Sequence, residues 1–193
     1  MWLGTFSGGV NFYNLEVNKF MHYRHTASPQ SLSNNTVFSI IEDAKKNLWV
    51  ATDGGGLNMM PHNGNKFKHY KHENGNSKSI SGNNVLKVYE DHDGNIWIGT
   101  WGEGITVFNP QTNVYRFYKN NPLDKNSLSS NNVWTFFEDA DNNMWVGTFG
   151  EGMDLYDRKH DNFIHHRYEA TKKNCLSDNT VRAIQADADG NLW

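Results

Sequence analysis

The sequence predicts an all-β protein built from consecutive copies of one repeating unit. Three observations lead to this prediction: tryptophans recur at one phase, turn-forming residues are abundant, and short aromatic and β-branched segments lie between the turns. Asparagine accounts for 27 of the 193 residues and glycine for 17, while aromatic residues make up 13%. Asparagine and glycine readily adopt the backbone conformations of tight turns, so this composition indicates many short strands.

The overall composition excludes several other classes of protein. Hydrophobic residues make up 37% of the chain, which together with the glycines is normal for a protein that buries a core. The net charge of −3 provides no basic surface, so we expect no nucleic-acid partner. No apolar run approaches the roughly 20 residues that span a bilayer, so we expect no membrane contact within this segment. Met1 is not followed by the basic and apolar regions of a signal peptide.

Five tryptophans set the register of the repeat. They are Trp2, Trp49, Trp97, Trp145 and Trp193, at intervals of 47, 48, 48 and 48 residues. The repeats therefore run over residues 2–48, 49–96, 97–144 and 145–192, within a single unit that covers 1–193. Periods of this length are typical of solenoids and propellers.

Three further signatures recur at the same spacing. A glycine-rich turn follows each Trp segment at Thr5–Gly9, Thr52–Gly56, Thr100–Gly104 and Thr148–Gly152. A [Leu/Ile]-Ser-x-Asn-x-Val segment recurs at Leu32–Val37, Ile80–Val85, Leu128–Val133 and Leu176–Val181. An acidic turn precedes each later Trp at Asp43–Asn47, Asp91–Asn95, Asp139–Asn143 and Asp187–Asn191. Because four signatures share one period, the repeat is well defined.

Each unit is predicted to contain four strands. In the third unit these are Val133–Glu138, Met144–Thr148, Met153–Tyr156 and Phe163–Arg167, each bounded by Gly, Asn or Asp. Four antiparallel strands in about 48 residues match the size of a propeller blade. The sequence thus predicts a β-propeller fragment of four blades with four antiparallel strands each, in which the Trp strand is the second.

The two ends of the repeat array predict an open arc of a longer propeller. The chain opens at the Trp strand of one blade and stops at the first residue of the next such strand. Val181–Ala186 would be able to supply the strand missing before Trp2, but Trp193 would then compete with Trp2 for its place. We therefore expect no sealed four-bladed ring. Since the open blade faces are apolar, we also expect the isolated chain to associate, with a dimer as one form.

The repeat resembles a known family, the two-component regulator propeller repeat. The clearest copy runs from Ile80 through Asn83, Val85 and the acidic turn to Trp97, Gly99 and Thr100. The resemblance implies a sensor region of a bacterial hybrid histidine kinase, commonly two seven-bladed propellers facing the periplasm. It also implies a periplasmic location, oligosaccharide ligands, and the remaining blades and signalling domains of a longer parent chain as partners. No kinase motif occurs in this sequence, so the resemblance implies no enzyme activity for this segment.

One end of the predicted blades carries the variable positions. The glycine-rich turns and the Leu-Ser-x-Asn-x-Val crossovers share this end because the strands alternate in direction. Three sets of residues differ there among otherwise matching repeats, and they provide the candidate ligand-binding residues: Phe6, Asp53, Trp101 and Phe149 after the Thr; Glu103 and Glu151 two positions later; and Phe38, Trp134 and Arg182 at the second position of the first strand. Aromatic faces with a few directed polar groups suit a sugar, but these aromatics also suit packing between blades.

Other recurrent residues have structural interpretations. A Trp at the same strand position of every blade is most simply core between blades. The crossover Asn (Asn35 or Asn34, and then Asn83, Asn131 and Asn179) is expected to bond loop backbone. The acidic turns resemble calcium loops, but Lys45 and Lys46 stand where ligands would be needed, so a hairpin turn with Asp capping its own backbone is favoured. Cys175 replaces the serines of the other repeats, and the sequence predicts no metal, cofactor or nucleophile.

Two alternatives to a non-catalytic sensor stay open. A propeller enzyme that cleaves a carbohydrate or lactone, similar to lyase-like or sialidase-like propellers, would need paired carboxylates such as Glu103 and Glu151. Both glutamates occupy equivalent turns, whereas an acid and base pair needs environments that separate the two pKa values. The other alternative is a protein-binding scaffold.

Overall fold

The computed structural model describes residues 1–14, 16 and 19–193, and every regular element among them is a β-strand. No helix among the described residues has the length and apolar character needed to cross a membrane. The fifteen strands of this part of the chain form four antiparallel sheets. The prediction of an all-β propeller fragment is therefore confirmed.

The strands follow one another within each sheet in chain order. The first sheet contains β1 (Trp2–Thr5), β2 (Gly9–Asn14) and β3 (Lys19–Tyr23). The second contains β4 (Val37–Glu42), β5 (Leu48–Thr52), β6 (Gly56–Met60) and β7 (Lys68–Tyr70). The third contains β8 (Val85–Glu90), β9 (Ile96–Thr100), β10 (Ile105–Asn109) and β11 (Val114–Tyr118). The fourth contains β12 (Val133–Glu138), β13 (Met144–Thr148), β14 (Met153–Asp157) and β15 (Asn162–His166).

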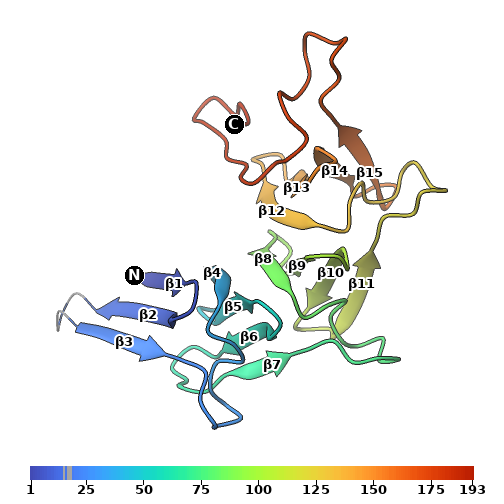
Figure 1. Ribbon diagram of the computed structural model, residues 1–193. Helices are drawn as coiled ribbons and strands as arrows, with labels where there is room; N and C mark the ends of the chain where they lie inside the picture. The colour runs from blue at the N-terminus through green and yellow to red at the C-terminus, as the bar shows by residue number, and fades with distance from the viewer. Residues whose placement is uncertain (15, 17–18) are drawn as a thin grey trace.

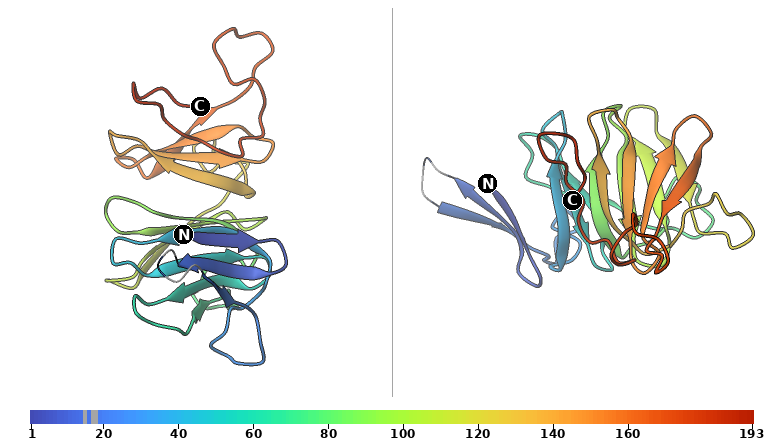
Figure 2. Two further views of the ribbon diagram at one scale, coloured as in Figure 1. Left: turned by 90° about the vertical axis from the view of Figure 1, so that its left-hand side faces the viewer. Right: turned by 90° about the horizontal axis from the view of Figure 1, so that it is seen from above.

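The four sheets are arranged around a common centre, as the blades of a propeller are (Figure 1). Strands β4, β8 and β12 form the inner edges, and β8 contacts both β4 and β12. In the right-hand view of Figure 2 the sheets lie side by side, and most strands of the second to fourth sheets run roughly up and down. Each four-stranded sheet takes its inner strand from the preceding Trp-to-Trp repeat, so the sheets and the sequence repeats are offset by one strand.

The core lies between neighbouring sheets. Trp49 on β5 is 1% exposed and belongs to a cluster with Val85 and Val88 of the next sheet. Trp97 on β9 is equally buried and packs with Val133 and Phe136 of the last sheet. Trp193, by contrast, is 79% exposed, because no sheet covers it. Burial of a Trp therefore depends on a following blade, as expected for a residue that packs between blades.

The acidic turns are hairpin turns that use their carboxylates internally. Asp91 on the β8–β9 turn accepts hydrogen bonds from the backbone N–H of Asp93 (3.1 Å) and of Asn95 (2.8 Å). The fourth residue of the turn, Gly94, has a φ of 74°, and Lys46 and Asn142 take its place in other turns with a φ of 63°. The structure thus confirms the hairpin interpretation of this motif.

At the ends of the chain, one prediction is corrected and one is confirmed. The first sheet has three strands instead of four, because β1 pairs only with β2. The segment Val181–Ala186, which would be able to supply the missing strand, forms no regular strand and, as expected, does not pair with β1. It docks instead on the last sheet, through a 2.9 Å bond from Val181 N–H to the Thr148 carbonyl, and forms a single bridge from Ala186 to Leu192. The arc is therefore open, as expected.

Candidate ligand-binding site

A β-bulge marks the second position of every inner strand. The register between β12 and β13 shifts between Val133 and Thr135, so Trp134 has no partner in the ladder. The same shift occurs around Phe38 on β4 and around Leu86 on β8. A bulge bends the strand and redirects one side chain, and bulges are frequent beside functional sites. Sequence reasoning found these positions through their variability, but it did not predict the bulges.

The glycine-rich turns position the variable residues that directly follow the Thr of each repeat, such as Trp101. Trp101 follows β9, and its backbone N–H donates a 2.9 Å bond to the Asn84 carbonyl of the preceding crossover. The Gly104 N–H donates a 3.0 Å bond to the Asn131 carbonyl of the next crossover. Gly104 has a φ of 73°, and a side chain there would collide with the Tyr118 carbonyl. The turn is therefore clamped between two crossovers, which sets the position of Trp101.

Three aromatic residues from two sheets meet at this end of the structure. The ring of Trp101 lies 5.4 Å from that of Phe149 and 6.2 Å from that of Trp134, measured between centroids. Trp134 and Phe149 are 6.4 Å apart. Trp101 is 43% exposed and Phe149 is 41% exposed, so both present part of a ring to solvent. These three residues are called the aromatic cluster below.

Arg182 completes the group. Its guanidinium carbon lies 5.4 Å from the centre of the Trp134 ring, within the range of a cation–π interaction. The Trp134 indole N–H is buried and has no hydrogen-bond partner among the described residues. Four of the nine predicted ligand-binding residues, from separate turns and strands, are therefore brought together.

The two predicted glutamates lie in the same turns but are paired elsewhere. Glu103 forms a 2.6 Å ion pair with Lys119, just beyond β11. Glu151 forms a 3.2 Å ion pair with Arg167, just beyond β15. Each carboxylate therefore pairs with a basic residue just beyond the outer strand of its own sheet.

The remaining predicted residues lie apart from the aromatic cluster. Phe6 is 78% exposed on the turn between β1 and β2, and Phe38 is 41% exposed on the bulge of β4. Asp53 is exposed on the turn between β5 and β6. Phe6 and Asp53 occupy the turn position of Trp101 and Phe149 in the first and second sheets, and Phe38 occupies the inner-strand position of Trp134.

Sequence reasoning missed a buried acid and base pair in the last sheet. Asp154 on β14 is fully buried and lies 2.6 Å from Nδ1 of His165 on β15. The Asp154 carboxylate also accepts a 2.8 Å bond from the Ser129 N–H. Burial raises the pKa of Asp154, against the lowering effect of these hydrogen bonds. Nε2 of His165 lies 2.8 Å from the Lys125 carbonyl, so both ring nitrogens are occupied and the pair holds the crossover to the sheet. In the second sheet Asn58 and His69 occupy the equivalent positions. The recurrence of a polar residue opposite a histidine was the signal in the sequence that pointed to this pair.

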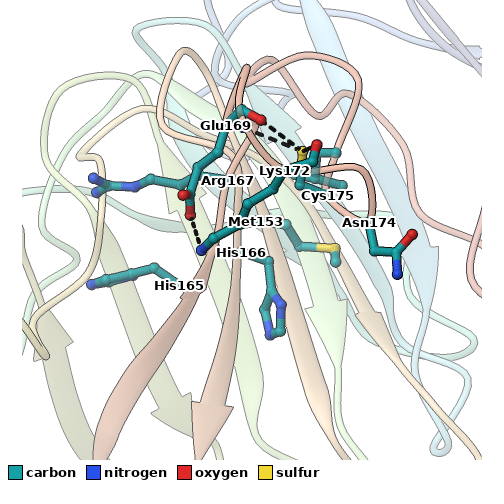
Figure 3. Close-up of a pocket in the computed structure, with 9 residues that line it drawn as sticks. Met153, His165, His166, Arg167, Glu169, Lys172, Asn174 and Cys175 are labelled. Carbon is teal, nitrogen blue, oxygen red and sulfur yellow. Dashed lines mark hydrogen bonds and ion pairs between the residues drawn. The ribbon is translucent and has the colours of Figure 1, made fainter.

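A cavity lies away from the aromatic cluster. It has a volume of about 450 Å³ and lies between β15 and the crossover that follows it (Figure 3). Its charged groups pair with protein residues, as Glu169 does with Lys172 at 2.7 Å. The Cys175 thiol accepts a 3.3 Å bond from the Glu169 N–H and closes the crossover turn, as Ser79 does through a 3.0 Å bond from the Glu73 N–H. The thiol therefore takes a structural place of the kind predicted.

No group of three His, Cys, Asp or Glu side chains within the described part of the chain is arranged to hold a metal ion.

The crossover asparagines have the role that was predicted for them. The Oδ1 atom of Asn83 accepts a 2.8 Å bond from the His72 N–H, and Asn131 and Asn179 accept equivalent bonds from Asn120 and Tyr168. In the first crossover this residue is Asn35, which accepts a 2.7 Å bond from the His25 N–H.

Comparison with solved structures supports the propeller architecture. The extracellular domain of BT3049 from B. thetaiotaomicron, described as a hybrid two-component system, superposes with a TM-score of 0.73 at 21% identity over 100% of this chain and 30% of its own. The extracellular domain of BT4673 from the same organism gives 0.79 at 24% identity, over 100% of this chain and 24% of its own. PorZ, a surface component of the type-IX secretion system of Porphyromonas gingivalis, gives 0.69 at 16% identity over 100% and 29%. The chain thus spans about a quarter to a third of each structure.

A family comparison identifies the repeat itself. No curated protein matches the chain. Four segments match the family described as the two-component regulator propeller, at residues 31–54, 79–102, 127–150 and 175–193. Each match begins in a crossover and covers an inner-strand position, an acidic turn and a recurrent Trp. The chain therefore belongs to the two-component regulator propeller family, whose repeat it contains in four copies.

Proposed function

We propose that this chain is the ligand-sensing propeller segment of a bacterial hybrid two-component signalling protein and that it has no catalytic activity of its own. The single observation that carries the proposal is the meeting of Trp101, Trp134, Phe149 and Arg182 at one end of the blades. These residues come from positions that vary between repeats, while the scaffold positions around them are the same. Family membership supports the signalling context.

The proposed ligand is an oligosaccharide. The aromatic cluster offers partly exposed rings for the apolar face of a sugar, and Arg182 offers several N–H donors for its oxygens. A few polar groups placed beside aromatic walls are typical of small-ligand sites.

The arrangement of the carboxylates argues against the enzyme alternative. A glycosidase needs one protonated and one ionised carboxyl group on either side of the scissile bond. Glu103 and Glu151 are instead both ion-paired, and their side chains are 49% and 48% exposed. Two such similar environments do not distinguish an acid from a base.

The location and the partners are part of the same proposal. The similar domains from B. thetaiotaomicron are described as extracellular, which supports a position outside the cytoplasm, in the periplasm or at the cell surface. Because the chain spans about a quarter to a third of those structures, we propose the remaining blades and signalling domains of a longer parent chain as its partners. Self-association into a dimer through the open blade faces remains part of the proposal.

Calorimetric titration of the chain with a panel of oligosaccharides tests this proposal. We expect binding by at least one of them, and Trp101→Ala should weaken it about tenfold or more, since a stacked ring contributes on the order of 1–3 kcal/mol. Asp141→Ala, in an exposed acidic turn at the opposite end, is the matched control and should leave the affinity unchanged. An assay for released reducing ends on the same samples should detect none.

Three outcomes would overturn parts of the proposal. Loss of binding by Asp141→Ala alone would move the site to the opposite end of the blades. Release of reducing ends would favour the enzyme. Failure of the folded chain to bind any oligosaccharide would reject sugar sensing and leave the protein-binding scaffold.

A further inference from the structure

We infer that the aromatic cluster and Arg182 select an anionic sugar, whose carboxylate or sulfate group pairs with the Arg182 guanidinium. This inference rests on the proposed sensing function and specifies the class of ligand. Its starting point is the location of Arg182, which lies 5.4 Å above the Trp134 ring. The ion pairs formed by the described residues do not include Arg182, although they engage Arg158 and Arg167. The guanidinium beside the cluster is therefore available to a ligand.

The two polar side chains of this site, Arg182 and Trp134, are both hydrogen-bond donors. Arg182 carries five N–H groups and no acceptor, and the Trp134 indole has one N–H. That indole N–H is buried and has no partner among the described residues. A buried donor without a partner is rare in folded proteins and is unfavourable. A ligand rich in acceptors satisfies such a site better than one whose hydroxyl groups donate as often as they accept.

The carboxylates of the neighbouring turns are engaged elsewhere. Glu103 and Glu151 are the carboxylates in the turns that carry Trp101 and Phe149, and each is paired with a basic residue on the outer side of its sheet. Their charge is therefore largely offset by Lys119 and Arg167. Arg182 consequently acts as the unpaired charge beside the aromatic cluster, and its preference is for a negative group.

The ring geometry defines what accompanies the charge. The planes of Trp101 and Trp134 are inclined at 80°, and those of Trp101 and Phe149 at 56°. Such rings form no flat stacking platform, and a ring stacked on one of them meets the edge of another. This favours a sugar ring, which has an apolar face and a polar edge, over an extended planar aromatic ligand. Because the Trp134 N–H is covered in the free protein, the Trp134 ring must turn if this donor is to reach the ligand.

The test compares ligands that differ in charge and are matched in length. The chain is titrated calorimetrically with galacturonate oligomers, with sulfated galactan oligomers and with neutral galactan oligomers. We expect at least one anionic series to bind about tenfold or more tightly than the neutral series, as charge-assisted hydrogen bonds from Arg are roughly twice as strong as neutral ones. The two anionic arms identify whether the preferred group is a carboxylate or a sulfate.

Two substitutions assign the preference to Arg182. Arg182→Gln should reduce anionic binding to the neutral level, and Arg182→Lys should retain part of the preference, because it keeps the charge without the planar fork. Arg24→Gln, which changes an arginine just beyond β3 on the first sheet, is the matched control and should have no effect. In a ¹⁵N spectrum the Trp134 indole resonance should shift when the anionic oligomer is added.

The outcomes separate this inference from the proposed function. Equal binding of neutral and anionic oligomers, with no effect of Arg182→Gln and a loss on Trp101→Ala, overturns the anionic preference and leaves the sugar sensor in place. Anionic preference that survives Arg182→Gln also overturns the inference, since the charge would then act elsewhere. Binding of none of the oligomers overturns both.

Discussion

The indole of Trp97 donates a 2.9 Å hydrogen bond from Nε1 to the carboxylate of Asp91, six residues earlier in the chain. Both side chains are buried, at 1% and 4% exposure of the residue. The same bond joins the recurrent Trp to the acidic turn in the other copies: Trp49 to Asp43, Trp145 to Asp139 and Trp193 to Asp187. The acidic turn and the core Trp are therefore one structural unit, which explains why the two signatures share a period.

Loss of this carboxylate should destabilise the chain strongly. Asp91→Ala removes the acceptor of the Trp97 indole and of two backbone N–H groups, and buried donors without partners cost about 1–3 kcal/mol each. We expect a decrease of about 3 kcal/mol in the free energy of unfolding, measured by urea denaturation. Asp141→Ala, an exposed residue of the last acidic turn, should change it by less than about 0.5 kcal/mol. Equal effects of the two substitutions would show that the Asp–Trp bond contributes little.

Glycine at position 99 is required by the sheet that packs against it. A Cβ on Gly99 would lie 2.8 Å from Val133 and 3.0 Å from Phe136, too close for either contact. Gly99→Ala should lower the free energy of unfolding by about 1–3 kcal/mol, the usual cost of overpacking. The second sheet has Ala51 at this position and Val88 in place of Phe136, which indicates that the size of the facing residue decides.

A double-mutant cycle tests this explanation for Gly99. In the background of Phe136→Val, the Gly99→Ala substitution should cost clearly less than in the original chain, because the facing side chain then resembles Val88. The measurement is the free energy of unfolding of the four proteins of the cycle. Strict additivity of the two substitutions would mean that Phe136 does not oppose the added methyl group.

The buried Asp154 predicts a pH dependence of stability. Burial raises its pKa above the ordinary 3.8, so the folded chain binds this proton more tightly than the unfolded chain does. The contribution of a group with a raised pKa is full at low pH and is lost as the pH rises through the folded-state pKa. Relative to the original chain, Asp154→Asn should therefore gain in free energy of unfolding from about pH 4 upward.

The second sheet offers the converse variant for this measurement. Asn58 is fully buried opposite His69, as Asp154 is opposite His165, so Asn58→Asp should introduce the same kind of pH dependence. Urea denaturation of the three proteins between pH 4 and pH 7 provides the comparison. If the original chain and Asp154→Asn gave parallel curves over this range, the pKa of Asp154 would not be raised.

Cys175 should be replaceable by serine but not by an apolar residue. Its thiol bonds the crossover backbone as the hydroxyl groups of Ser31, Ser79 and Ser127 do. Cys175→Ser should leave the thermal midpoint nearly unchanged, whereas Cys175→Val leaves the Glu169 N–H without its partner and should lower it. Ser127→Val is the matched control and should lower the midpoint in the same way. A large loss on Cys175→Ser would indicate a role that the other repeats lack.

Much of the fold could be predicted because its signals are local. The predicted strand Val133–Glu138 coincides with β12, and the predicted Met144–Thr148 coincides with β13. The predicted Phe163–Arg167 differs from β15 by one residue at each end, as is usual for strand boundaries. Turn residues and short aromatic segments specify such strands without reference to the rest of the chain. The docking of Val181 on Thr148 of the last sheet was not predicted, because it depends on a contact between residues that lie far apart in the sequence.

The candidate site was predictable only as a set of positions. The variability of Trp101, Trp134, Phe149 and Arg182 against a constant scaffold singled them out. Glu103 and Glu151 stood out for the same reason, yet their side chains are paired with Lys119 and Arg167, 16 residues further along the chain in each case. Nothing in the local sequence of a turn indicates which way its glutamate points.

The sequence by itself determined the repeat, the order of strands, the hairpin turns and the end of the blades on which the variable residues lie. These follow from residue types and spacing within about 48 residues, where backbone preferences and alternation act directly. Only the tertiary structure decided that Trp101 meets Phe149 and Trp134 of the next sheet, and that a bulge redirects Trp134. The physical reason is that such contacts depend on the packing angle between sheets and on the irregular pairing of the inner strands. Both arise from the whole set of contacts between blades and from no single segment.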